Sequence, residues 1–113
     1  MADKPIVVVR VELSGTEPIA IIKPAMGRTA RLRKLLAYNN DSASHTVEIG
    51  SWDGSTFTPL LAKISVAAGS NTVLSKDELP AAELVGDGVR SLAARLEASA
   101  TNPVELALEI EVL

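Results

Sequence analysis

The chain has 113 residues, of which 47% are hydrophobic and none is cysteine, and its formal net charge is −3. This length is close to the commonest size of a single domain, so we expect one domain over residues 1–113. The lack of cysteine excludes a disulfide framework and a thiolate nucleophile, and no apolar run approaches the roughly 20 residues of a transmembrane helix.

The apolar content and the charge distribution both bear on association. A small domain this rich in apolar residues often buries some of them between subunits, so we expect a homo-oligomer, with an alanine- and valine-rich monomer core as the alternative. Residues 1–34 carry seven basic and three acidic side chains, whereas residues 77–113 carry two and eight. This gradient predicts contacts between neighbouring subunits, pairing of terminal strands within one chain, or solvated faces of separate strands.

The first segments of the chain predict two strands. Residues 4–13 alternate in polarity, and Ile6–Val9 is apolar on both faces, which is typical of a strand that is covered at one end. Ile19–Lys23 predicts a short second strand. Its flanking residues Pro18 and Pro24 favour an edge position, because proline cannot donate to a ladder.

The segment from residue 28 to residue 38 is compatible with a helix or a strand. Intrinsic propensity favours a helix with leucines on one side and basic residues opposite. We predict a strand, because the neighbouring segments are β and the run leads into the turn signal Asn39–Ser42. Regular alternation would place Leu32, Leu36 and Tyr38 on one face of this strand.

The centre of the chain reads as strands joined by turns. Asp53-Gly54 lies between the predicted strands His45–Trp52 and Thr56–Leu61, and this dipeptide suits a two-residue hairpin turn in which both positions have positive φ. Pro59 is expected to break or bulge the second of these strands. Further strands are predicted over residues 62–66 and 71–74.

The C-terminal third predicts one change of period. Ser75 and Glu78 have capping-box spacing before an apolar stretch, which predicts one short helical turn near residues 76–85. Val89–Ser99 and Val104–Leu113 then read as strands, the second with strict alternation of apolar and mostly acidic residues. The whole pattern predicts an all-β fold, an antiparallel β-sandwich of jelly-roll or immunoglobulin-like type with about eight strands.

Residues suited to chemistry are few. The chain has one histidine, His45, and we expect it to lie at the surface or to be hydrogen-bonded, because a metal site needs several convergent ligands. No nucleophile elbow or phosphate-binding glycine pattern is present, so we expect no enzyme, no metal and no cofactor. The basic group of residues 28–34 has no interleaved aromatic residues and the net charge is negative, so no nucleic acid is expected as a partner. No membrane is expected either, because the longest apolar runs are only a few residues.

Four short stretches set the rhythm of strands and turns: Leu36–Asn40, His45–Ile49, Trp52–Gly54 and Ile64–Gly69. In this order they resemble small β-sandwich virion proteins of tailed phages and related viruses, including head-decoration, minor capsid and tail-associated subunits. The resemblance implies a non-enzymatic structural subunit that oligomerises and packs on a capsid or tail shell protein. It implies a location in the virion, or in the cytoplasm during assembly, and it identifies no functional residue.

The two terminal strands are the predicted interface. Unpaired strand edges invite pairing with another chain, and Val104–Leu113 has no proline or charge cluster that would prevent this. We therefore expect at least one terminal strand to lie at a subunit interface. The residues expected there are Ile6, Val7, Val8, Val9, Ile110 and Val112.

An alternative function is a carbohydrate- or cell-surface-binding module. In this hypothesis Trp52 stacks on the face of a sugar and Asp53 lies beside it in the turn. Against it, a tryptophan beside a hairpin in a chain with few aromatic residues is more often buried in the core. The first residues, Met-Ala-Asp-Lys-Pro, contain no charged segment followed by an apolar core, so we expect no secretory signal.

Overall fold

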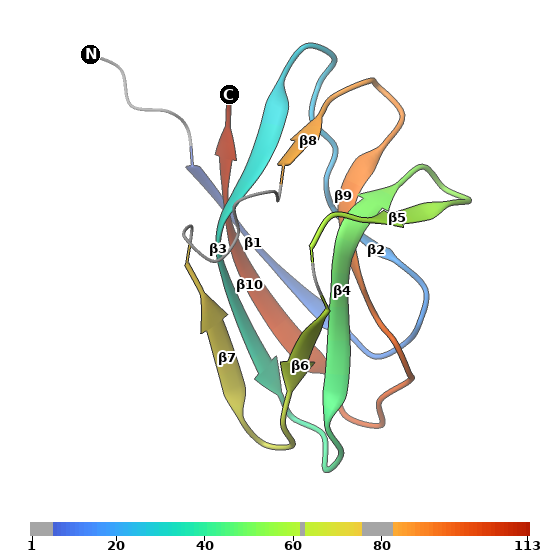
Figure 1. Cartoon of the computed structure of the whole chain (residues 1–113), viewed down its shortest axis with the longest axis vertical. Helices are drawn as coiled ribbons and strands as arrows, with labels where there is room; N and C mark the ends of the chain where they lie inside the picture. The colour runs from blue at the N-terminus through green and yellow to red at the C-terminus, as the bar shows by residue number, and fades with distance from the viewer. Residues whose placement is uncertain (1–5, 62, 76–82) are drawn as a thin grey trace.

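The computed structural model describes residues 6–61, 63–75 and 83–113, and every regular element in these ranges is a β-strand (Figure 1). None of the described residues forms a helix long and apolar enough to cross a bilayer. The strands are β1 (Ile6–Leu13), β2 (Ile19–Ile22), β3 (Thr29–Asn39), β4 (His45–Trp52), β5 (Phe57–Pro59), β6 (Ile64–Val66), β7 (Asn71–Leu74), β8 (Glu83–Val85), β9 (Ser91–Leu96) and β10 (Val104–Val112).

The strands form two antiparallel sheets that pack on each other. The first sheet has the order β1-β10-β3-β7, with β8 also paired to β3, and the second has the order β2-β9-β4-β5, with β6 also paired to β4. Since β7 and β8 pair with different parts of β3, and β5 and β6 with different parts of β4, each pair acts as one interrupted strand. If β5 with β6 counts as the fifth strand, β7 with β8 as the sixth, β9 as the seventh and β10 as the eighth, the two sheets have the strand orders 1-8-3-6 and 2-7-4-5. This is the order of an eight-stranded jelly roll, one of the two predicted sandwich types.

The core lies between the sheets and comes from alternate residues of their inner faces. In β10, Leu106, Leu108 and Ile110 are at most 1% exposed, whereas Glu105 and Glu109 point outward. The alternation predicted for the last strand is therefore confirmed. Facing it, Val47 and Ile49 of β4 are completely buried.

A β-bulge interrupts β3. Its pairing with β10 joins Lys34 to Glu109 but Leu32 to Ile110, so Arg33 is an extra residue in β3. An inserted residue resets which side chains face the core. The prediction of a strand here is confirmed.

The bulge also changes the faces of β3. Leu32 and Leu35 are both buried, whereas Leu36 and Tyr38 point outward. The prediction that Leu32 shares a face with Leu36 and Tyr38 was wrong, because regular alternation does not hold across the bulge.

Two other local predictions are corrected. The turn after Trp52 is a four-residue loop in which Gly54 has a φ of 101°, whereas no described residue other than glycine has positive φ. The Asp53 carboxylate closes this loop by accepting hydrogen bonds from the backbone nitrogens of Ser55 and Thr56, at 2.8 and 2.7 Å. Residues 83–85 form β8 and not a helical turn, because they pair with the first residues of β3; residues 76–82 of that prediction lie outside the described residues.

Candidate functional site: an apolar sheet face with an acidic groove

The outer face of the first sheet carries side chains from neighbouring strands in cross-strand rows. One row joins Arg10 of β1, Ala107 of β10, Leu36 of β3 and Val73 of β7. Leu36 and Val73 are 37% and 50% exposed, and Ala107 presents only a methyl group between Arg10 and Leu36. The centre of this row is therefore apolar, and its side chain is short enough to leave a hollow between the longer neighbours.

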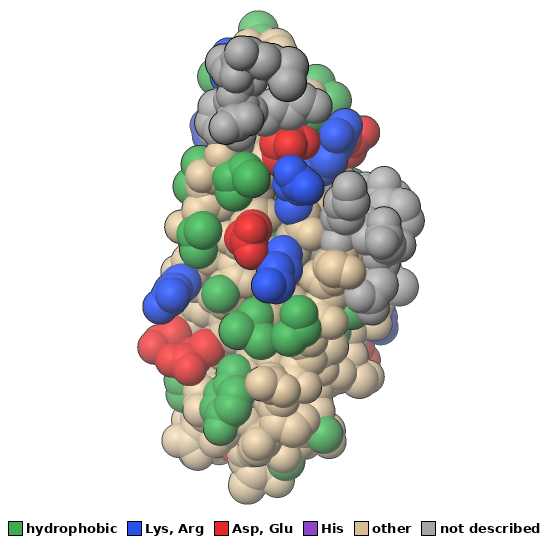
Figure 2. Space-filling model, turned by 90° about the vertical axis from the view of Figure 1, so that its left-hand side faces the viewer, with side chains coloured by type: hydrophobic (Ala, Val, Ile, Leu, Met, Phe, Trp, Pro, Cys, Tyr) green, Lys and Arg blue, Asp and Glu red, His purple; other side chains and the backbone are tan. Residues whose placement is uncertain are grey.

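The neighbouring row is polar and partly aromatic. It joins Glu12 of β1, Glu105 of β10, Tyr38 of β3 and Asn71 of β7. Tyr38 is 41% exposed, so an aromatic ring stands on this face beside the exposed carboxylates. Figure 2 shows this side of the molecule, with hydrophobic side chains near the middle and acidic ones next to them.

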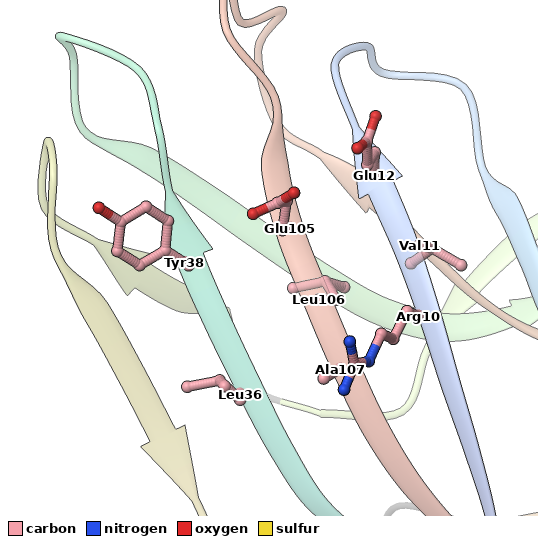
Figure 3. A pocket seen from close by; sticks show the side chains of 8 residues that line it. All are labelled: Arg10, Val11, Glu12, Leu36, Tyr38, Glu105, Leu106 and Ala107. Atoms are coloured by element: carbon pink, nitrogen blue, oxygen red, sulfur yellow. The ribbon is translucent and has the colours of Figure 1, made fainter.

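A groove of about 460 Å³ lies along these two rows (Figure 3). Its volume is within the range of ligand pockets, roughly 300–1,000 Å³. In the close view the side chain of Arg10 extends over β10 toward Ala107, so the small alanine provides the hollow. The lining residues are Arg10, Val11, Glu12, Leu36, Tyr38, Glu105, Leu106 and Ala107.

The carboxylates of the groove are not neutralised within the described part of the chain. Glu12 and Glu105 are directly opposite each other in the β1–β10 ladder, a position in which like charges repel. Neither of them, nor Arg10, forms an ion pair with a described residue. The groove thus combines an apolar floor with two carboxylates and one guanidinium group, and its net charge is negative.

The basic residues of β3 are, in contrast, paired within the chain. Arg31 and Arg33 both reach the nearly buried Glu111 of β10, at 3.5 and 3.1 Å, and Lys34 lies 4.0 Å from Glu109. These contacts join β3 to β10, whereas the charge gradient predicted pairing of the two terminal strands as one of its alternatives; β1 does pair with β10, but the ion pairs come from β3.

The N-terminal strand has an open side. Ile6 and Val8 point outward beside the groove face and are 50% and 59% exposed. Val7 and Val9 lie on the opposite face of the strand, where Val9 packs against the core and Val7 is still 39% exposed. Among the described strands, β1 is at the edge of its sheet and pairs with β10 on one side only. All four predicted interface residues of β1 thus lie along a sheet edge.

The C-terminal strand has no open side. β10 lies between β1 and β3, so both of its edges are paired. Ile110 is completely buried in the core and Val112 is half-buried. Their side chains offer little surface to a partner. The sequence did not reveal this placement, because the residues of β10 do not indicate which strands lie on either side of it.

A buried polar cluster lies at the end of the sandwich where β3 meets β4. The Asn39 side chain donates to the carbonyl oxygens of Ala43 and Val66, at 2.8 and 3.0 Å, and accepts from the backbone nitrogen of Asp41 at 2.9 Å. His45 Nε2 lies 2.6 Å from Asp41 Oδ2, and this hydrogen bond holds the pKa of Asp41 below its usual value. His45 is therefore hydrogen-bonded, as predicted. Nowhere among the described residues do three or more potential metal ligands gather.

Trp52 and Asp53 lie at the far end of β4 from this cluster. Trp52 is half-buried on the second sheet opposite Phe57, whose ring is covered by the Arg95 guanidinium at 4.1 Å from its centre. The Asp53 carboxylate is engaged by the turn, and hydrogen bonds from the backbone of Thr56 and Ser55 lower its pKa. The part of Trp52 that remains exposed is the surface a stacked sugar would use.

Comparison with known proteins gives distant likenesses only. No protein-family model and no curated protein matches the sequence. The chain is similar to the virus-like particle of the extra small virus of the giant freshwater prawn Macrobrachium rosenbergii, with a TM-score of 0.46 and 14% identity over 99% of this chain and 80% of that chain. It is also similar to the coat protein of Tobacco streak virus, with a TM-score of 0.37 and 14% identity over 94% and 85%. Both neighbours come from viruses, though neither is a tailed-phage decoration protein. Because both TM-scores are low, the jelly-roll description rests on strand order alone.

Proposed function

We propose that this chain is a non-enzymatic structural subunit that associates with copies of itself or with a shell protein in a virion. The observation that carries this proposal is the outer face of the first sheet. There, apolar side chains from three strands lie exposed in neighbouring rows, and the edge of β1 is open. Exposed apolar surface of this kind, next to an unpaired edge strand, is typical of an interaction site.

The fold is compatible with this role, but it is also compatible with other functions. Jelly rolls occur in viral capsid proteins, lectins and cupins. Function must therefore be argued from a site, and the site here has the character of a protein contact surface. The rhythm of strands and turns that resembles small virion proteins supports the same choice, with decoration, minor capsid and tail roles as its finer alternatives.

Sedimentation velocity of the purified chain over a range of micromolar concentrations tests the proposal. We expect a concentration-dependent shift to larger species. Replacing Val8 by lysine should weaken association by roughly tenfold or more, because a buried valine contributes about 1.5–3 kcal/mol and 1.4 kcal/mol corresponds to tenfold in affinity.

Thr58→Lys provides the control. Thr58 is exposed, as is Val8, but it lies in β5 at the outer edge of the second sheet. Association should be unchanged in this variant. A wild-type chain that stays monomeric and binds no shell protein would sink the proposed function.

A further inference from the structure

We propose that the groove on the outer face receives the loop of residues 23–28 from a second copy, which gives a head-to-tail contact between subunits. This inference rests on the proposed function, because it assumes that copies associate. It adds which two surfaces meet and which chemistry joins them.

The loop between β2 and β3 has the composition of a ligand for an acidic, apolar groove. Its residues are Lys-Pro-Ala-Met-Gly-Arg, and Met26 is 75% exposed, more than any other large hydrophobic residue described. Lys23 and Arg28 are both exposed, and neither forms an ion pair with a described residue. An apolar tip is thus flanked by two free positive charges.

The backbone of this loop is held in place. The Arg28 nitrogen donates to the Ala25 carbonyl at 2.9 Å, and the Gly86 nitrogen donates to the Arg28 carbonyl at 2.7 Å. Gly27 has a φ of 84°, which allows the tight turn. Pro24 is buried at the base. A loop that is already ordered loses little conformational entropy when it binds.

The groove matches this loop in charge and in shape. Its floor of Ala107 and Leu36 offers apolar contact to a methionine side chain, which adapts readily to irregular hollows. Glu12 and Glu105 repel each other in the isolated chain, so a cation between them would relieve that repulsion. The ring of Tyr38 beside them adds a favourable surface for a guanidinium group.

The loop cannot enter the groove of its own chain. Arg28 precedes the first residue of β3, whereas Leu36 and Tyr38 lie near the other end of this extended strand. At about 3.3 Å per residue, Arg28 and Leu36 are separated by roughly 25 Å. Figure 1 likewise places the β2–β3 loop at the opposite end of β3 from its Asn39 terminus. The contact is therefore between copies and heterologous, the type that generates rings or continuous arrays.

Charge reversal tests the contact from both sides. In one variant Glu12→Lys and Glu105→Lys make the groove basic; in another Lys23→Glu and Arg28→Glu make the loop acidic. Each variant alone should self-associate at least tenfold more weakly than wild type in sedimentation velocity. An equimolar mixture should recover association, because the basic loop of the first variant meets the unchanged acidic groove of the second, and the reversed pair also attracts.

Single reversals elsewhere are the controls. Glu17→Lys and Lys63→Glu change exposed charges outside both surfaces and should leave association as in wild type. Met26→Asp tests the loop side again if a groove variant loses its circular dichroism spectrum, and it too should weaken association at least tenfold.

The outcomes separate the two proposals. Association that is weakened by Val8→Lys but indifferent to the groove, loop and Met26 variants would overturn the loop–groove contact and leave the proposed function standing. A wild-type chain that never self-associates would overturn both. Weakened single variants without recovery in the mixture would also refute the contact, because complementary charges would then not be meeting.

Discussion

Replacing Asn39 by alanine should remove a polar anchor from the interior of the sandwich. Asn39 is 0% exposed, and its side chain forms three hydrogen bonds that tie the end of β3 to the following loop and to β6. At roughly 0.5–1.5 kcal/mol each, the loss sums to about 3 kcal/mol of unfolding free energy. The carbonyls of Ala43 and Val66 would also be left without these donors. For a domain of this size we expect the melting temperature to fall by roughly 10 °C.

Urea denaturation followed by tryptophan fluorescence and by far-ultraviolet circular dichroism measures this loss. Asn40→Ala is the matched control, because Asn40 is adjacent and exposed and its side chain makes one hydrogen bond, to the Pro103 carbonyl at 3.0 Å. Its cost should stay below about 1 kcal/mol. Equal midpoints for the two variants would refute the view that burial makes the Asn39 network important.

The other predictions concern packing, acid stability and register. In Gly50→Ala the new Cβ would clash with the Thr58 carbonyl oxygen, so we expect the unfolding free energy to fall by about 1–3 kcal/mol in urea titrations, whereas Gly15→Ala meets nothing within 4 Å and should be neutral. The folded-state pKa of Asp41 is lowered from 3.8, so its ionised carboxylate stabilises the fold above about pH 3.8, and this stabilisation is lost as the pH falls through the lower folded-state pKa. Asp41→Asn should therefore flatten the acid limb of a curve of unfolding free energy against pH. Deleting Arg33 removes the extra residue of the bulge and leaves Leu32 and Leu35 two positions apart on the core face, so we expect cooperative thermal unfolding to be retained. Deleting Ala37, which is paired on both sides, should abolish it, because one part of β3 must then turn its core side chains to solvent.

The sheet architecture was predictable where local pattern decides it. Val104–Leu113 alternates without interruption, and the strand assignment and the inward face of β10 followed directly. The turn signal after residue 38 and the β character of the neighbours were enough to choose strand over helix for β3. In these segments the polarity of each residue indicates whether its side chain faces the core or solvent, so the sequence pattern alone predicts the strand.

Features that depend on a partner strand were not predictable. The bulge in β3 arises from its pairing with β10, and no residue near Arg33 marks it. Residues 83–85 carry a helix-like sequence but complete the edge of β3, so tertiary pairing overrides local preference. The groove likewise needs Arg10, Ala107 and Leu36 to come from three strands that are far apart in sequence.

The distribution of charge in the folded chain bears on how copies could meet. Part of the basic N-terminal and acidic C-terminal excess is neutralised where Arg31 and Arg33 contact Glu111, so it is not available to a partner. Among the described residues near the first sheet, Glu12, Glu105 and Arg10 in the groove and Lys23 and Arg28 in the loop of residues 23–28 have no ion-pair partner, so the groove keeps a net negative charge and the loop a positive one. An isologous dimer that buried the groove would bring two grooves of net negative charge together around its two-fold axis and would leave the cations of the loop unpaired. A head-to-tail arrangement instead joins unlike charges at every contact, and such a heterologous contact generates rings or open arrays.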